Sequence, residues 1–265
     1  MLHPALGLPP REVPLNALDP SGSPLPHADF RRVKPQLLWG RVAIKETLTE
    51  AVETVARNYD FTQHPYFQWA AQPGRTREEF LRSQIPFRFA VENFSQALAG
   101  VLAHIPRVED RIHVAENVAE EHGHGNVGVS HKYTFLEYLH AMGATEEQLK
   151  EPCPIWVTAF NHSIRNLCLA QPYDVGAACL GGIEHLYVNI SGAISRLIHE
   201  RGWVQPGSQR HYAVHEQLDV AHAKELLDLA EPAWESPRTR SYAALGLLLG
   251  AYYFWTLYED LLVGI

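Results

Sequence analysis

The stretch 211–231, HYAVHEQLDVAHAKELLDLAE, sets the pattern for the whole chain, because its apolar residues recur at helical spacing. His215, Asp219 and His222 stand at i, i+4 and i+7, which at about 100° per residue places them within roughly 60° of one helical face. Leu218 and other apolar neighbours indicate that this face points inward. Two imidazoles and a carboxylate on a buried strip are costly without a cation between them. Taken alone, the stretch is compatible with either a metal-binding helix or a solvated polar face that carries two histidines, and the rest of the chain must decide between them.

The composition is that of an ordinary globular protein, with 265 residues, 46% hydrophobic residues, 20% charged residues and a net charge of −8. The acidic balance argues against a nucleic acid or an anionic membrane as the main partner. No signal peptide opens the chain, no apolar run is long enough to span a bilayer, and the three cysteines lack metal or redox spacing. We therefore expect a cytoplasmic protein whose partner is a small molecule.

Helical periodicity begins at about residue 40, and segments of alternating polarity are essentially absent. Helices are expected over about 40–58, 76–105 with a bend near Pro86, 107–121, 131–142, 155–170, 173–201, 209–230 and 239–262. Thr76 and Glu79 have the spacing of a capping box, whereas 64–74 (HPYFQWAAQPG) is typical of a turn-rich connector. The proline-rich residues 1–38 predict an extended arm. The sequence thus predicts one all-α domain over 39–265, preceded by that arm.

Acidic or imidazole groups also stand on other faces that look buried. Glu92 lies among aromatic residues of its helix, unless it reaches water at the edge of the apolar stripe. Glu121 and His124 form Glu-x-x-His, the i, i+3 pair of di-iron carboxylate bundles. His131 competes with His124 for that role, because the glycine-rich segment between them makes a continuous helix doubtful. Glu184 follows small residues on a helix that is apolar on most sides, where a glutamate is expected to be paired unless it lies on a solvated strip of that helix.

Together these residues offer four carboxylates and three imidazoles from four helices, with His124 and His131 as alternatives for one position. Oxygen-rich mixed ligation of this size suits two iron ions, or manganese, better than one zinc ion. Four carboxylates would also offset the charge of two divalent ions. Within this set, Asp219 and Glu121 are the candidates for a direct part in a reaction.

The set resembles the haem-oxygenase-like di-iron oxidases, which are relatives of the thiaminase-like and pyrroloquinoline-quinone-synthase-like helical proteins. The matching stretches are ENVAEEHGHGNVGVSHKYTFLEYL (116–139), GGIEHLYVNI (181–190) and HYAVHEQLDVAHAKEL (211–226). The resemblance implies a bundle of about seven core helices that binds two ferrous ions and uses O₂ as co-substrate. It implies as ligands Glu92, Glu121, Glu184, His215, Asp219 and His222, completed by His124 or His131.

The implied activity is oxidation of a small metabolite by N-oxygenation, oxidative decarboxylation or C–C cleavage, with an amino-acid-like or fatty-acid-like substrate. Arg88 and Arg165 are candidates to meet a substrate carboxylate. One alternative is a cofactor-independent oxidase or a thiaminase-like enzyme on the same fold, for which Cys179 is the candidate nucleophile. Another is a non-catalytic helical binding protein. The apolar C-terminal helix is either core or the face of a homodimer.

Overall fold

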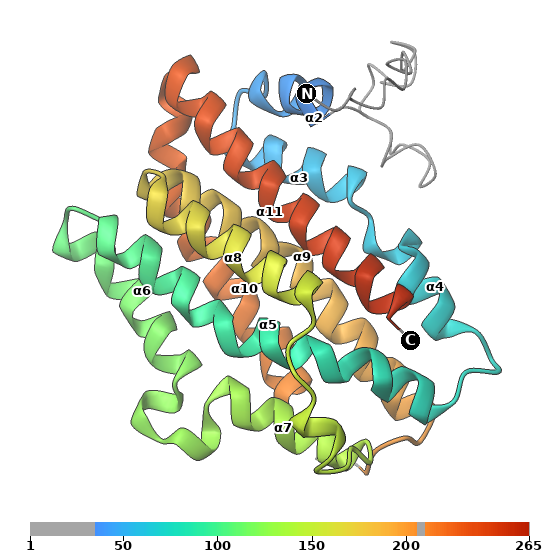
Figure 1. Cartoon of the computed structure of the whole chain (residues 1–265). Coiled ribbons are helices and arrows are strands. Elements are labelled where there is room, and N and C mark those ends of the chain that lie inside the picture. The colour runs from blue at the N-terminus through green and yellow to red at the C-terminus, as the bar shows by residue number, and fades with distance from the viewer. Residues whose placement is uncertain (1–34, 206–209, 265) are drawn as a thin grey trace, which may run out of the picture.

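The computed structural model describes residues 35–205 and 210–264, without the side chains of residues 35–38, 210 and 213–217. Within these residues the chain forms α-helices and short 3-10 turns and no strand, so the prediction of an all-α fold is confirmed. The helices are α2 (Pro35–Ala43), α3 (Leu48–Asn58), α4 (Pro65–Ala71), α5 (Arg77–His104), α6 (Val108–Glu121), α7 (His131–Ala141), α8 (Ile155–Ala170), α9 (Tyr173–Glu200), α10 (Arg210–Ala230) and α11 (Pro237–Val263) (Figure 1).

Local sequence signals explain where the first long helix begins. The Thr76 side chain accepts a hydrogen bond from the backbone N–H of Glu79, and the Glu79 carboxylate accepts one from the backbone N–H of Thr76 at 2.8 Å. This reciprocal pair is the predicted capping box, and it satisfies two amides that have no partner inside the helix. Helix α5 then continues through Pro86 to His104.

The N-terminal part of the domain differs from the sequence prediction in two places. The helix expected over 40–58 is divided, because Thr47 forms a second capping box with Glu50 and starts α3. The connector expected over 64–74 contains α4, since Pro65 occupies the first helical turn and the His64 side chain caps it. Of the predicted arm, residues 1–34 lie outside the described residues, and residues 35–38 belong to α2.

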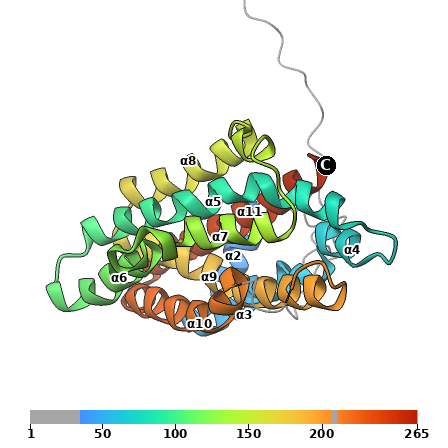
Figure 2. The same cartoon turned by 90° about the horizontal axis from the view of Figure 1, so that it is seen from below.

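Helix α9 is the central element of the bundle. It packs along α10 and α11 and also contacts α5 and α8, while α5 and α8 pack against each other. In Figure 2, α8 and α10 lie on opposite sides of the bundle. Most residues of α9 are buried, in keeping with its nearly continuous run of apolar and small residues.

Small residues bring the backbones of α9 and α11 close together. A Cβ atom on Gly250 of α11 would lie 2.3 Å from the carbonyl oxygen of Cys179 in α9, far inside van der Waals contact. Glycine is therefore required at that crossing. None of the described helices combines the length and apolar character that crossing a membrane requires.

Candidate metal centre

Helices α9 and α10 bring three of the predicted ligands together. Glu184 of α9 and Asp219 and His222 of α10 are all buried, and each offers a ligand atom within 4.8 Å of those of the other two. Nitrogen and oxygen ligands bind first-row metals at about 2.1 Å, so atoms on opposite sides of one ion are about 4.2 Å apart. A small contraction of the side chains would therefore place these three atoms around a single ion.

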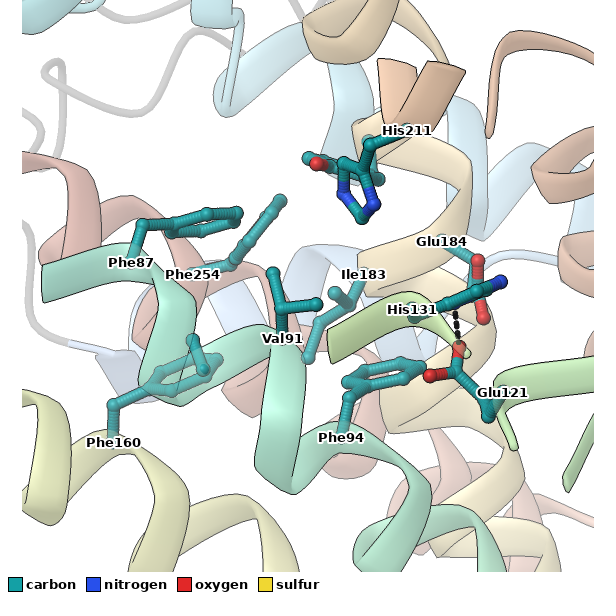
Figure 3. A pocket seen from close by; sticks show the side chains of 12 residues that line it. Phe87, Val91, Phe94, Glu121, His131, Phe160, Ile183, Glu184, His211 and Phe254 are labelled. Carbon is teal, nitrogen blue, oxygen red and sulfur yellow. Dashed lines mark ion pairs between the residues drawn. The ribbon is translucent and has the colours of Figure 1, made fainter. Parts of the chain in front are cut away.

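Helices α6 and α7 supply a second pair beside the first group. Glu121 is the last residue of α6 and His131 the first of α7, and His131 Nδ1 lies 2.8 Å from Glu121 Oε1 (Figure 3). The loop between them turns sharply at Gly123, where φ is +62°. A Cβ atom added to this residue would lie only 2.8 Å from the amide nitrogen of Ser130. Only glycine fits such a turn without strain. The turn thus returns the chain so that His131 faces Glu121.

Buried carboxylates dominate the electrostatics of this space. Burial, the negative charges of Asp219 and Glu121, and a hydrogen bond with Asp219 raise the pKa of Glu184 well above its ordinary value, against the opposite effect of a hydrogen bond from Asn117. Carboxylates held this closely away from water repel one another unless protons or cations compensate them. The donor set therefore fits a divalent cation.

The imidazole of His131 responds to the same negative charge. Its burial disfavours the charged imidazolium, but the charge of Glu121 and the hydrogen bond to it, with the charges of Asp219 and Glu120, outweigh burial and raise the pKa of His131. Protons on Glu184 and His131 thus reduce the negative charge of the centre in the metal-free protein.

Glu120 holds the imidazole of His222. Its Oε2 lies 2.6 Å from His222 Nε2, and the His222 side chain is buried whereas that of Glu120 is about one quarter exposed. Glu120 lies about 100° round α6 from Glu121, so the two carboxylates point in different directions. Both residues reach the centre because α6 ends there, so that Glu120 faces α10 and Glu121 faces α7.

The remaining predicted ligands lie elsewhere or outside the described side chains. Glu92 is exposed on α5 and pairs with Lys132 Nζ at 2.6 Å. His124 is exposed in the loop after α6 with a φ of 50°. The structure therefore brings neither of them to the group formed by the other ligands. His215 lies on α10, one turn before Asp219, but its side chain is not among those described.

Two further buried polar residues adjoin the centre and were not predicted. Asn117 stands one turn before Glu121 on α6, and His211 stands two turns before Asp219 on α10. His211 Nδ1 is hydrogen-bonded to Thr134 Oγ1 at 3.2 Å. Helical spacing relative to the predicted ligands is the signal that would have found both residues.

A narrow cavity of about 60 Å³ adjoins the centre. Its acidic end consists of Glu121, His131, Glu184 and His211. Its apolar wall consists of Phe87, Ala90, Val91, Phe94, Phe160, Ile183, Tyr187 and Phe254. Figure 3 shows Glu121, His131 and Glu184 on one side of the cavity and the rings of Phe87, Phe160 and Phe254 on the other.

Comparisons with known proteins match most of this chain. The model of a family described as iron-containing redox enzymes matches residues 79–252, which include the whole centre. The 4-aminobenzoate synthase of Chlamydia muridarum (strain MoPn / Nigg) is 22% identical over 197 residues, which are 72% of this chain and 82% of the relative.

Solved structures share the fold at low sequence identity. A domain of unknown function with a heme oxygenase-like fold from Shewanella denitrificans OS217 has a TM-score of 0.65 at 15% identity, covering 82% of this chain and 92% of that one. A TenA homologue from P. horikoshii OT3 has a TM-score of 0.59 at 12% identity, covering 90% and 98%. The helical fold is thus haem-oxygenase-like, as the sequence predicted.

Proposed function

The chain belongs to the family of iron-containing redox enzymes, and we propose that it is a non-haem di-iron oxidase or oxygenase that uses O₂ to oxidise a small metabolite. The observation that carries the proposal is the convergence of three buried carboxylates and two buried imidazoles on one space beside a cavity. Oxygen-rich ligation with imidazole suits iron or manganese. Without a cation, burying this much negative charge would only destabilise the protein.

The proposed ligand set divides between two ions. Glu184, Asp219 and His222 would hold one ion, and Glu121 with His131 would contribute to the other. His215 is proposed as a further ligand from its place on α10. When bound, ferrous iron would supply the electrons that reduce O₂.

The protein residues position and shield this chemistry. With His222 Nε2 donating a hydrogen bond to Glu120, Nδ1 would be the nitrogen available to a metal ion, and the bond would fix the direction of the ring. A carboxylate in this role raises the basicity of the histidine it holds. The apolar wall keeps bulk water from the substrate side of the centre, where Phe94 and Ile183 lie between the aromatic rings and the acidic end (Figure 3).

A thiaminase-like reaction on the same fold finds less support in the structure. The Cys179 thiol that would act as nucleophile is fully buried, and it is not among the residues that line the cavity. Burial, together with the neighbouring Cys168, raises the pKa of Cys179 well above its ordinary value. A thiol held protonated in an apolar interior is a poor nucleophile.

The chlamydial relative suggests one specific product to look for. Its name, 4-aminobenzoate synthase, describes formation of an aromatic amino acid whose ring would suit an apolar cavity. We therefore include 4-aminobenzoate in the products to be assayed.

Anaerobic titration with ferrous iron, followed by exposure to O₂, tests the proposal. We expect about two iron ions per chain and O₂ consumption that depends on iron. Asp219→Ala and His222→Ala should abolish both while the circular dichroism spectrum of the protein remains helical. Full O₂ consumption in either variant, or less than one iron bound in the presence of candidate substrates, would contradict a di-iron centre.

A further inference from the structure

The cavity beside the metal centre divides sharply into polar and apolar parts. All polar side-chain atoms except the Tyr187 hydroxyl belong to its acidic end, and the remaining lining is hydrocarbon or aromatic ring. Four residues of the apolar wall come from successive turns of one face of α5, and others come from α8, α9 and α11. A molecule bound there would place its body against this wall and one end against the metal ligands.

The cavity lining, among the described residues, contains no lysine or arginine. The two arginines expected to meet a substrate carboxylate are engaged elsewhere. Arg88 donates to the backbone carbonyls of Ile85 and Glu151, each at 2.7 Å, and to a third carbonyl. Arg165 donates to Gln96 Oε1 at 2.9 Å. The described part of the lining therefore offers neither lysine nor arginine to a substrate carboxylate.

An α-ammonium group would be equally poorly accommodated. Among the described residues of the lining, the anionic groups are the carboxylates of Glu121 and Glu184, and both belong to the proposed ligand set. An ammonium group would have to compete with the metal for them or lie against hydrocarbon. Burying an unpaired charge in such surroundings is strongly unfavourable.

We infer that the substrate has an apolar alkyl or aryl body and a single oxygen-bearing head group, and carries no α-ammonium group. This inference rests on the proposed function, because the head group meets the metal at the acidic end. It favours fatty-acid-like substrates over zwitterionic amino acids. The aromatic side chains Phe87, Phe160 and Phe254 contact the body of the substrate, and Ala90 and Val91 set the width of the space.

The test compares ligands that differ only in the ammonium group. Protein loaded with Zn²⁺, which is redox-inert, is titrated in a calorimeter with 3-phenylpropanoate and with L-phenylalanine. We expect 3-phenylpropanoate to bind at least about tenfold more tightly. In the series hexanoate, heptanoate and octanoate, affinity should rise by about fourfold for each methylene that enters the cavity.

Substitutions in α5 test whether these ligands bind in the cavity. Ala90→Leu fills the space and should weaken binding of 3-phenylpropanoate by about tenfold. Ala99→Leu is the matched control, because Ala99 is exposed on the same helix, and it should leave the affinity unchanged. Val91→Ala widens the space and should shift the best chain length upward, which provides a second measurement if Ala90→Leu fails to fold.

Each outcome has a separate meaning. Equal or tighter binding of L-phenylalanine would overturn the inferred substrate class. Affinities that do not change with chain length, or an Ala90→Leu variant that binds 3-phenylpropanoate as tightly as wild type, would overturn it as well. Failure of the protein to bind Zn²⁺ is measured independently in the loading step. That result would overturn the proposed metal centre on which the inference rests.

Discussion

Replacing Glu184 with glutamine should stabilise the metal-free protein near neutral pH and destabilise the metal-loaded protein relative to wild type. Without metal, burial and the charges of Asp219 and Glu121 raise the pKa of Glu184 well above its ordinary value of 4.5. The folded state therefore favours the neutral carboxyl group. The stability that this proton confers is fully present below pH 4.5 and is lost as the pH rises through the folded-state pKa.

The pH dependence of the free energy of unfolding follows from the titration of a single proton on Glu184. Between the unfolded and folded pKa values, the free energy of unfolding should fall by about 1.4 kcal/mol per pH unit. Glutamine is neutral at every pH, keeps the shape of the side chain and can still bond to Asn117, so it removes this slope. His131, whose pKa is also raised, adds a slope of the same sign above its ordinary value, common to both proteins.

Urea unfolding at several pH values in the presence of a chelator measures these slopes. Glu116→Gln is the control, because Glu116 is exposed on α6 and should keep the wild-type slope. After addition of Zn²⁺ the order of stability should reverse, since wild type binds the ion with one more anionic ligand. Equal slopes in wild type and Glu184→Gln, or a variant that is less stable than wild type at pH 7 without metal, would refute the electrostatic account.

Three further predictions concern the ligands and the packing. Glu120→Gln should weaken Zn²⁺ binding by about tenfold to a hundredfold, measured by competition with a chromophoric chelator, because the carboxylate orients a ligand; unchanged affinity would deny it that role. His131→Ala should lower the number of metal ions bound per chain, measured by elemental analysis, whereas His124→Ala should not. The opposite result would show that His124 is the ligand and His131 is not. Gly250→Ala should destabilise the protein by about 2 kcal/mol or more in urea unfolding, because its Cβ would strike the backbone of α9. Gly40→Ala, which adds a Cβ to an open position in α2, is the control, and equal stability of the two variants would show that α9 and α11 can separate without cost.

The sequence was most informative where one helix holds several polar residues at regular spacing. Asp219 and His222 lie three residues apart, and helical geometry alone places them on one face, where the structure finds them buried together. Glu184 could be predicted because it is a charged residue on an otherwise apolar helix, where a buried carboxylate needs a proton or a cation as partner. The capping box of Thr76 and Glu79 was equally local and was confirmed.

The sequence was least informative where the chain leaves a helix. The choice between His124 and His131 depends on a left-handed turn at Gly123 and on two short 3-10 turns, which no helical period describes. The part played by Glu120 depends on α10 lying beside the end of α6, a tertiary contact between residues about 100 positions apart. Glu92 looked like an unpaired carboxylate among aromatic residues, but its partner Lys132 is 40 positions away.

The ligands differ widely in sequence separation, and we expect parts of the centre to form at different stages of folding. Glu121 and His131 are ten residues apart, and the short loop between α6 and α7 brings them together at little cost in chain entropy. Glu184 and Asp219 are separated by 35 positions, and Glu120 and His222 by 102. Contacts of long sequence separation are costly to form early, so the local pair would be available before the remaining ligands arrive. A metal ion captured by that pair would then recruit α9 and α10, and its supply during synthesis would affect how fast the bundle closes as well as how stable it becomes.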